Sequence, residues 1–248
     1  MPKSTMSTTL NYSPNFDVKK RKVKELKFII FHYTGMKKEN QAITRLTNSK
    51  SKVSSHYLIK NNGEILTLVP DLHVAWHAGI SSWKNYKSIN KYSIGIEISN
   101  PGHEYSYKKF SKKQIKSIIK LSIYLKKKYK IKSNFILGHS DIAPDRKKDP
   151  GEKFPWKYLS KNKIGYWHNL NEKKLFKKRN QLVDKQEKKK FIKNLYKLGY
   201  PKNILFNKYK YSKLLITAFQ RRFRQELVNG IIDQECLFIS NNLAKNMK

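Results

Sequence analysis

Four short apolar runs constrain the fold of this chain more than any other feature of its sequence. They cover residues 26–33, 54–70, 92–99 and 134–139. The runs are rich in β-branched and aromatic residues, a composition typical of buried strands. The second run is interrupted by Asn61, Asn62 and Gly63, which tolerate positive φ, so it predicts two strands joined as a hairpin. The third run brings Glu97 onto a strand, and two other runs end at or beside His32 and His139.

A long amphipathic segment, residues 111–130, separates the last two of these strands. Its apolar residues recur at helical spacing, and Ser111 stands where a helix N-cap is expected. Strands that alternate with such a covering helix predict an α/β domain. Its functional residues are expected at the ends of the strands.

The composition changes after about Trp167. Residues 171–190 are charged and weakly apolar, which indicates a linker or an exposed helix, and three helix-like segments follow at 191–200, 213–230 and 232–246. We therefore expect a catalytic domain at residues 1–175, a linker at 176–186 and a small helical domain at 187–248.

The net charge of +37 raises the question of a nucleic-acid partner, because basic side chains bind polyanions by releasing counterions. Only seven of the 54 basic residues are arginine, the residue usually used for bidentate recognition of bases and phosphates. The lysines are spread along the whole chain. We interpret most of this charge as solvated surface and expect no specific nucleic-acid partner.

Cellular location is left open by the sequence. The N-terminal residues lack the apolar stretch of a secretory signal peptide, and no run approaches the roughly 20 apolar residues of a transmembrane helix. The single cysteine, Cys236, cannot form an internal disulfide, so we expect the fold to depend on packing and on a metal ion. We expect a monomer.

His32, His139 and Asp149 are candidate metal ligands. A catalytic zinc site commonly uses three protein ligands and leaves one position open. Both histidines lie at predicted strand ends, and a loop containing Pro144 and Pro150 can bring Asp149 back towards them. Taken alone, each histidine could equally be a hydrogen-bonded residue of the core or the surface.

Five motifs add a family resemblance. The sequences FIIFHYTG, SSHYLI, WHAG, SIGIEISN and GHSDIAPDRKKDPG followed by FPW occur in the same order as in the zinc-dependent N-acetylmuramoyl-L-alanine amidases. This part of the chain, roughly residues 11–160, resembles the AmiD-type members. The resemblance implies a mixed central β-sheet flanked by helices, zinc as cofactor, and peptidoglycan or muropeptides as substrate.

The same resemblance implies roles for individual residues. His32, His139 and Asp149 would hold zinc, Glu97 would be the general base, and Lys147 would donate to the oxyanion. The alternatives are a buried acid paired with a lysine for Glu97 and a solvated surface lysine for Lys147. Trp76 and His77, from the WHAG motif, would line the substrate groove, although packing is an alternative for both. His56, in the middle of a predicted strand, is expected to be a structural histidine.

The C-terminal segment resembles the peptidoglycan-binding domain of bacterial cell-wall hydrolases. The residues that carry this resemblance are LYKLGY (195–200), AFQRRFRQ (218–225) and NGIIDQECLFISNNL (229–243). The alternative is a helical appendage packed on the catalytic domain. A wall-binding domain favours the periplasm, whereas the lack of a signal peptide favours cytoplasmic recycling of muropeptides.

Two other functions remain open on the sequence alone. One is a peptidoglycan-binding protein without catalysis, against which the complete ligand and base set argues. The other is a basic nucleic-acid-binding protein, which rests only on charge.

Overall fold

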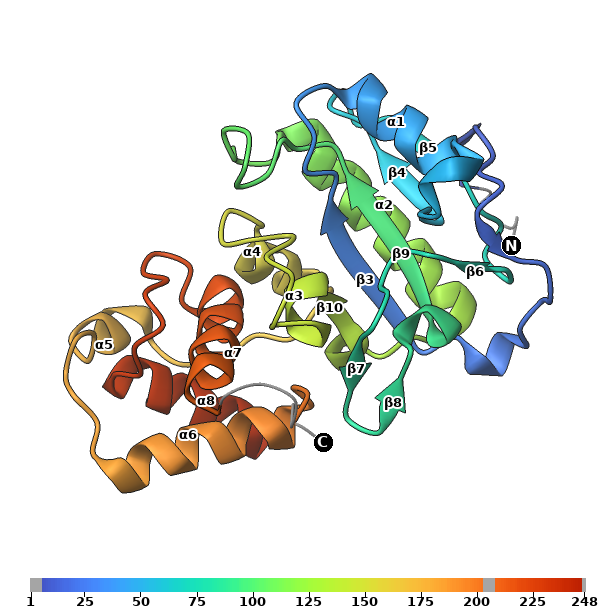
Figure 1. Cartoon of the computed structure of the whole chain (residues 1–248). Coiled ribbons are helices and arrows are strands. Elements are labelled where there is room, and N and C mark those ends of the chain that lie inside the picture. Colours follow the sequence, from blue (N-terminus) through green and yellow to red (C-terminus); the bar gives the residue numbers. More distant parts are fainter. Residues whose placement is uncertain (1–5, 203–207, 247–248) are drawn as a thin grey trace.

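A six-stranded mixed sheet forms the centre of the computed structural model (Figure 1). The structure describes residues 6–202 and 208–246, and in the second range it describes side chains from residue 212 onward. The strands of this sheet, in spatial order, are β1 (Thr9–Leu10), β5 (Ile65–Thr67), β4 (Tyr57–Ile59), β9 (Ser93–Ile98), β3 (Phe28–Tyr33) and β10 (Ile136–Gly138). Neighbouring strands are parallel except β4 and β5, which form the predicted hairpin. The expected α/β class with a mixed sheet is confirmed.

Helices and short strands surround this sheet. Two small antiparallel sheets are formed by β2 (Phe16–Asp17) with β6 (Val74–Ala75) and by β7 (Ser82–Trp83) with β8 (Tyr86–Lys87). The α-helices are α1 (Glu39–Thr47), α2 (Lys112–Tyr129), α3 (His139–Ile142), α4 (Trp156–Lys161), α5 (Glu172–Phe176), α6 (Lys185–Leu198), α7 (Lys208–Phe223) and α8 (Gln234–Asn246). The 3-10 helices are η1 (Val23–Glu25), η2 (Ser49–Ser51), η3 (Ile89–Tyr92) and η4 (Ser133–Phe135).

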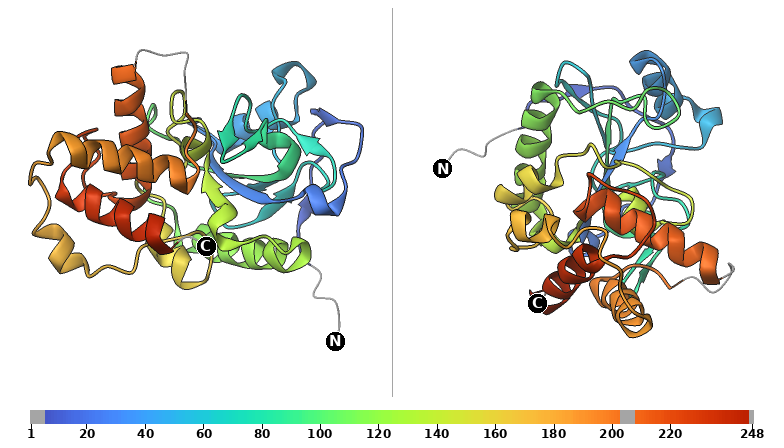
Figure 2. Two further views of the ribbon diagram at one scale, coloured as in Figure 1. Left: turned by 90° about the horizontal axis from the view of Figure 1, so that it is seen from below. Right: turned by 90° about the vertical axis from the view of Figure 1, so that its left-hand side faces the viewer.

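Helix α2 covers one face of the sheet, as the views of Figure 2 show. It begins at the predicted cap, because the Ser111 hydroxyl accepts from the Gln114 amide and the Gln114 side chain accepts from the Ser111 amide. Alternate residues of β3 and β9 point at this helix and form a buried cluster with it, including Ile29, Phe31, Ile94, Ile96, Ile98, Ile118, Leu121 and Leu125. Side chains alternate along a strand, so the residues between them face the other side.

Residues of that opposite face share a buried cluster with the C-terminal helices. Phe28 and Ile30 of β3 and Leu137 of β10 belong to one buried cluster with residues of α6, α7 and α8, among them Phe191, Leu195, Phe219 and Leu243. The sheet and the C-terminal helices thus bury a common apolar core. The expected boundaries at 175 and 186 fall within α5 and α6, and the division into domains stays a prediction.

Asp141 connects the C-terminal helices to the turn that carries His139. The Asp141 carboxylate is 1% exposed, accepts from the Tyr200 hydroxyl at 2.8 Å, and pairs with the Arg222 guanidinium. Arg222 also donates to the carbonyl oxygen of Ile136 at 3.1 Å. On its own turn, Asp141 accepts from the Gly138 amide at 2.8 Å, so the ion pair stabilises the start of α3.

That local structure corrects one expectation. His139 was expected to end a strand, but β10 ends at Gly138 and His139 is the first residue of α3. The reason is the capping contact of Asp141, which starts a helical turn directly after the glycine. Among residues 6–202 and 208–246, no helix is both long and apolar enough to span a bilayer.

Replacing Arg222 by methionine should lower the free energy of unfolding by about 3–5 kcal/mol, because it leaves the buried Asp141 carboxylate without its counter-charge. Urea denaturation of the purified proteins measures the change. Arg221→Met is the matched control: the side chain is half-buried in the same helix and takes part in no ion pair among the described residues. Equal stability of the two variants would contradict this role of Arg222.

Candidate metal centre and pocket

Parallel pairing of neighbouring strands brings His32 and His139 together. Gly138, the last residue of β10, pairs with Phe31 of β3, so the residues that follow them, His139 and His32, reach the same place. The loop after α3 returns Asp149 to this point, held by a hydrogen bond of 2.8 Å from the Ser140 amide to the Asp149 carbonyl oxygen. All three residues are buried.

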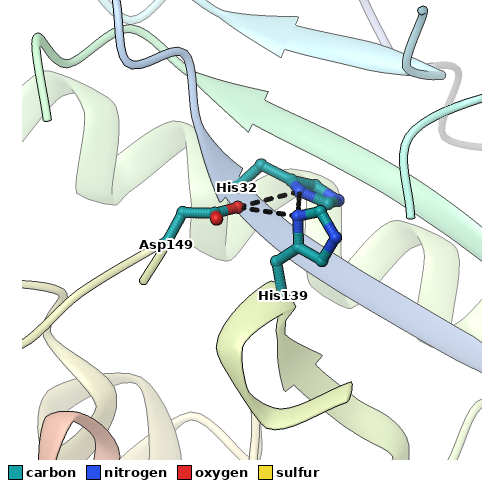
Figure 3. A group of neighbouring side chains, drawn as sticks. All are labelled: His32, His139 and Asp149. Atoms are coloured by element: carbon teal, nitrogen blue, oxygen red, sulfur yellow. Dashed lines mark hydrogen bonds and ion pairs between the residues drawn. The ribbon is translucent and has the colours of Figure 1, made fainter. Parts of the chain in front are cut away.

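The three side chains point their ligand atoms at one another (Figure 3). The Nδ1 atoms of His32 and His139 are 3.0 Å apart, and Oδ2 of Asp149 lies 3.0 Å from the first and 3.1 Å from the second. Ligand atoms of a tetrahedral zinc ion, with bonds of about 2.0–2.2 Å, are separated by roughly 3.3 Å. Two imidazoles and one carboxylate at this spacing fit zinc.

The ionisation of these groups suits a metal. Burial, together with the neighbouring His139, lowers the pKa of His32 to about 4, so its imidazole is neutral at pH 7. Burial of Asp149 acts to raise its pKa, but His139 and His32 outweigh this and hold the pKa well below its ordinary value. His139 Nε2 lies 3.1 Å from the carbonyl oxygen of Ala78, which can only accept. His139 therefore carries a hydrogen on Nε2, which leaves Nδ1 as the atom that can bind a metal.

Glu97 lies beside this group because it pairs with His32 in the register of β9 and β3. Burial, with a smaller contribution from Asp149, raises the pKa of Glu97 to about 8. Its Oε2 atom is buried without a hydrogen-bond partner among the described residues. A carboxylate with such a pKa, next to a metal group, is typical of a general acid or base.

These residues open into one cavity of about 480 Å³. The candidate residues of the sequence that line it are His32, Trp76, His77, Glu97, His139, Lys147 and Asp149. Arg45, Arg146 and Lys148 add positive charge to the same cavity. The structure therefore brings together all seven candidates.

His56 lies outside this group. It is fully buried, and its Nδ1 accepts from the Gly95 amide at 3.0 Å. Burial and the nearby Arg21 lower the pKa of His56 to about 3, so it is neutral. This is the structural histidine that the sequence predicts.

Arg146 and His103 are two of the lining residues that the sequence did not predict. Arg146 lines the cavity and donates to the carbonyl oxygen of Ile80, in the loop after His77, at 2.6 Å. His103 is held by the Tyr33 hydroxyl at 2.9 Å and by Glu152 at 3.0 Å. The available signals were the position of Arg146 within the GHSDIAPDRKKDPG motif and that of His103 just after the strand of Glu97.

Comparison with known proteins identifies relatives of the chain. Residues 22–152 match the family model described as N-acetylmuramoyl-L-alanine amidase. The N-acetylmuramoyl-L-alanine amidase AmiD of Escherichia coli K12 is 34% identical over 232 residues, which are 89% of this chain and 83% of AmiD.

Solved structures resemble the whole fold. The E. coli AmiD structure, in complex with the substrate anhydro-N-acetylmuramic acid-L-Ala-D-gamma-Glu-L-Lys, has a TM-score of 0.78 at 33% identity and covers 89% of each chain. AmpDh3 of Pseudomonas aeruginosa has a TM-score of 0.77 at 27% identity, covering 99% of this chain and 97% of AmpDh3.

Asp149→Ala should abolish stoichiometric binding of a divalent metal, because it removes the only negative charge of the three-residue group. Metal content after dialysis against zinc, measured by elemental analysis, provides the test. Asp145→Ala, at a half-exposed acid of the same loop, should bind metal like the parent chain. Full metal content in the Asp149 variant would remove this residue from the set of ligands.

Proposed function

This chain belongs to the N-acetylmuramoyl-L-alanine amidase family, and we propose that it is a zinc hydrolase that cleaves the amide bond between N-acetylmuramic acid and L-alanine. Peptidoglycan and its soluble fragments are the proposed substrates, in cell-wall turnover or recycling. One observation carries the proposal: the buried group of His32, His139 and Asp149 shares a cavity with the buried carboxyl of Glu97.

Zinc is the proposed cofactor because the donor set, two imidazoles and one carboxylate, matches its preferences. When bound, it would lower the pKa of a water molecule to about 7 and polarise the amide carbonyl. His32, His139 and Asp149, which line the cavity, would hold it.

Glu97 is the proposed general base. It would accept a proton from the attacking water, whose oxygen bonds to the lactyl carbonyl carbon. The carbon–nitrogen bond to L-alanine then breaks, and Glu97 would return the proton to the leaving amine. A pKa of about 8 suits both steps, since the group can hold and release a proton near neutral pH.

Lys147 is the proposed donor to the carbonyl oxygen as negative charge develops there. Its backbone amide bonds to the Ala143 carbonyl oxygen at 3.0 Å, which fixes the residue in the loop two positions before Asp149. Its side chain lines the cavity. Trp76, whose indole donates to Asp17 at 2.8 Å, is the proposed wall of the substrate groove.

The substrate class follows from the cavity and from the relatives. A cavity of about 480 Å³ accommodates a sugar and the first residues of a peptide. Arg45, Arg146 and Lys148 would complement the carboxylates of such a peptide. E. coli AmiD was solved with an anhydromuramyl peptide as substrate, which supports muropeptides as one class for this chain.

The segment 187–248 is the proposed wall-binding part. On and around α8, large apolar side chains face solvent: Ile231 is 57% exposed and Phe238 45%, and Leu182, which precedes the segment but forms a β-bridge to Asp233 within it, is 84% exposed. Exposed apolar side chains close to one another are typical of binding surfaces. Contact with the wall polymer would raise the local substrate concentration without changing the chemical step.

Glu97→Gln should reduce turnover of a soluble muropeptide by at least about 100-fold, because the amide cannot accept the proton of water. Mass spectrometry of the released peptide measures the rate, and elemental analysis should find an unchanged zinc content. Glu104→Gln, at an exposed acid lining the same cavity, should keep most of the activity. Parent-like turnover in the Glu97 variant would exclude it as the base.

Leu182→Ser combined with Phe238→Ser should weaken binding to purified sacculi by about 1 kcal/mol or more, roughly fivefold. The measurement is sedimentation of inactive Glu97→Gln protein with sacculi at low and high salt. Ile123→Ser, at a side chain of α2 that is 48% exposed, is the control. Retention that is unaffected by the double change and lost at high salt would assign wall binding to the lysines instead.

A further inference from the structure

The imidazole of His77 lies directly behind the proposed ligand His32. Its Nδ1 is 3.0 Å from His32 Nε2, and its Nε2 is 3.0 Å from the Ser93 hydroxyl. His77 is 9% exposed. Both of its nitrogens are engaged within the protein, so neither is left for a substrate although the residue borders the cavity.

Ser93, His77 and His32 form a series of hydrogen bonds, and the direction of each bond follows from one carbonyl group. The Ser93 hydroxyl lies 2.7 Å from the carbonyl oxygen of Ile89, which can only accept, so the single hydroxyl hydrogen points there. Ser93 must then accept from His77 Nε2. The buried His77 ring contacts only His32 and Ser93 through its nitrogens and has no carboxylate partner among the described residues, so its neutral form with one N–H is the one that fits this position.

With its hydrogen on Nε2, His77 offers a lone pair at Nδ1. His32 must therefore donate from Nε2, and the lone pair of His32 Nδ1 is free to face His139 and Asp149. This is the tautomer that a metal ligand bound through Nδ1 requires. The opposite order would place a hydrogen on His32 Nδ1 and prevent coordination.

We propose that His77 and Ser93 are positioning residues that hold His32 in its metal-binding tautomer and orientation. This inference rests on the proposed function, in which His32 is a zinc ligand. In this proposal His77 positions His32 instead of lining the substrate groove, and Ser93 takes part by orienting His77.

The sheet is built to receive this ring. Ser93, Gly95 and Glu97 are alternate residues of β9 and share the face opposite α2. A Cβ atom on Gly95 would come within 2.4 Å of the His77 ring, so only glycine leaves room for it. Along this face of β9, Ser93 contacts the His77 ring, Gly95 lies under the ring, and Glu97 pairs with His32.

The loop that carries His77 serves the other histidine ligand as well. The Asn90 side chain accepts from the backbone amides of His77 at 3.2 Å and Ala78 at 2.7 Å. The Ala78 carbonyl oxygen then accepts from His139 Nε2 at 3.1 Å. Two neighbouring residues of one anchored loop thereby set the tautomers of both His32 and His139.

The test compares zinc dissociation constants, measured by competition with a chromogenic chelator, for His77→Phe, His77→Asn, Ser93→Ala and Ser99→Ala. His77→Phe removes the acceptor and should raise the constant about 10- to 100-fold, the usual range for partners of a metal-bound histidine. Ser93→Ala should raise it by about tenfold. Ser99→Ala should have no effect, because that buried hydroxyl, just beyond β9, has no partner among the described residues.

His77→Asn separates positioning from packing. Asparagine fills the space less well than phenylalanine, but its amide oxygen can accept from His32 Nε2. The proposal therefore expects tighter zinc binding in His77→Asn than in His77→Phe, whereas a packing role expects the reverse. Urea denaturation of the four variants shows which of them are folded, and Ser93→Ala, the smallest change, keeps the test decisive if both His77 variants unfold.

The outcomes distinguish this inference from the proposed function. If the parent chain binds zinc and hydrolyses muropeptides while Ser93→Ala and His77→Phe bind zinc equally well, the positioning role is wrong and the amidase function stands. If the parent chain itself binds no zinc, both proposals fail together.

Discussion

The register between β3 and β9 is the constraint on which the rest of the structure depends. Because side chains alternate along strands, this pairing sends Ile29, Phe31 and the isoleucines of β9 to α2, and it sends His32 and Glu97 to the opposite face. A shift of one residue in either strand would move its polar group into the apolar layer under α2. The apolar pattern that builds the core therefore also aligns the site.

Much of the fold could be predicted because its signals are local. The hairpin was evident from Asn62 and Gly63, and α2 from its periodicity and its capping Ser111. The start of α3 could not be predicted, since it depends on Asp141, whose partners Tyr200 and Arg222 are about 60 and 80 residues away. Sequence patterns within a short window contain no information about such contacts.

The site was predicted mainly through the family motifs. From the residues alone, His32 and His139 were indistinguishable from ordinary buried histidines, because convergence of their Nδ1 atoms is a tertiary property. The relation between His77 and His32 was missed for the same reason. A small signal was present: serine and glycine precede Glu97 at alternate positions of an otherwise isoleucine-rich strand. Small residues on one face of a strand indicate that a bulky side chain packs there.

The sheet and the C-terminal helices share one apolar core, and this core couples the local unfolding of the two parts. Phe28 and Ile30, on the strand that ends beside the candidate metal site, belong to the same buried cluster as residues of α6, α7 and α8, so detachment of these helices would open the cluster that includes β3. Proteins open in cooperative units that follow such buried contacts. We therefore expect the backbone amides of β3 and those of the C-terminal helices to exchange as one unit, so that the order of the candidate metal site depends on residues that follow it in the chain.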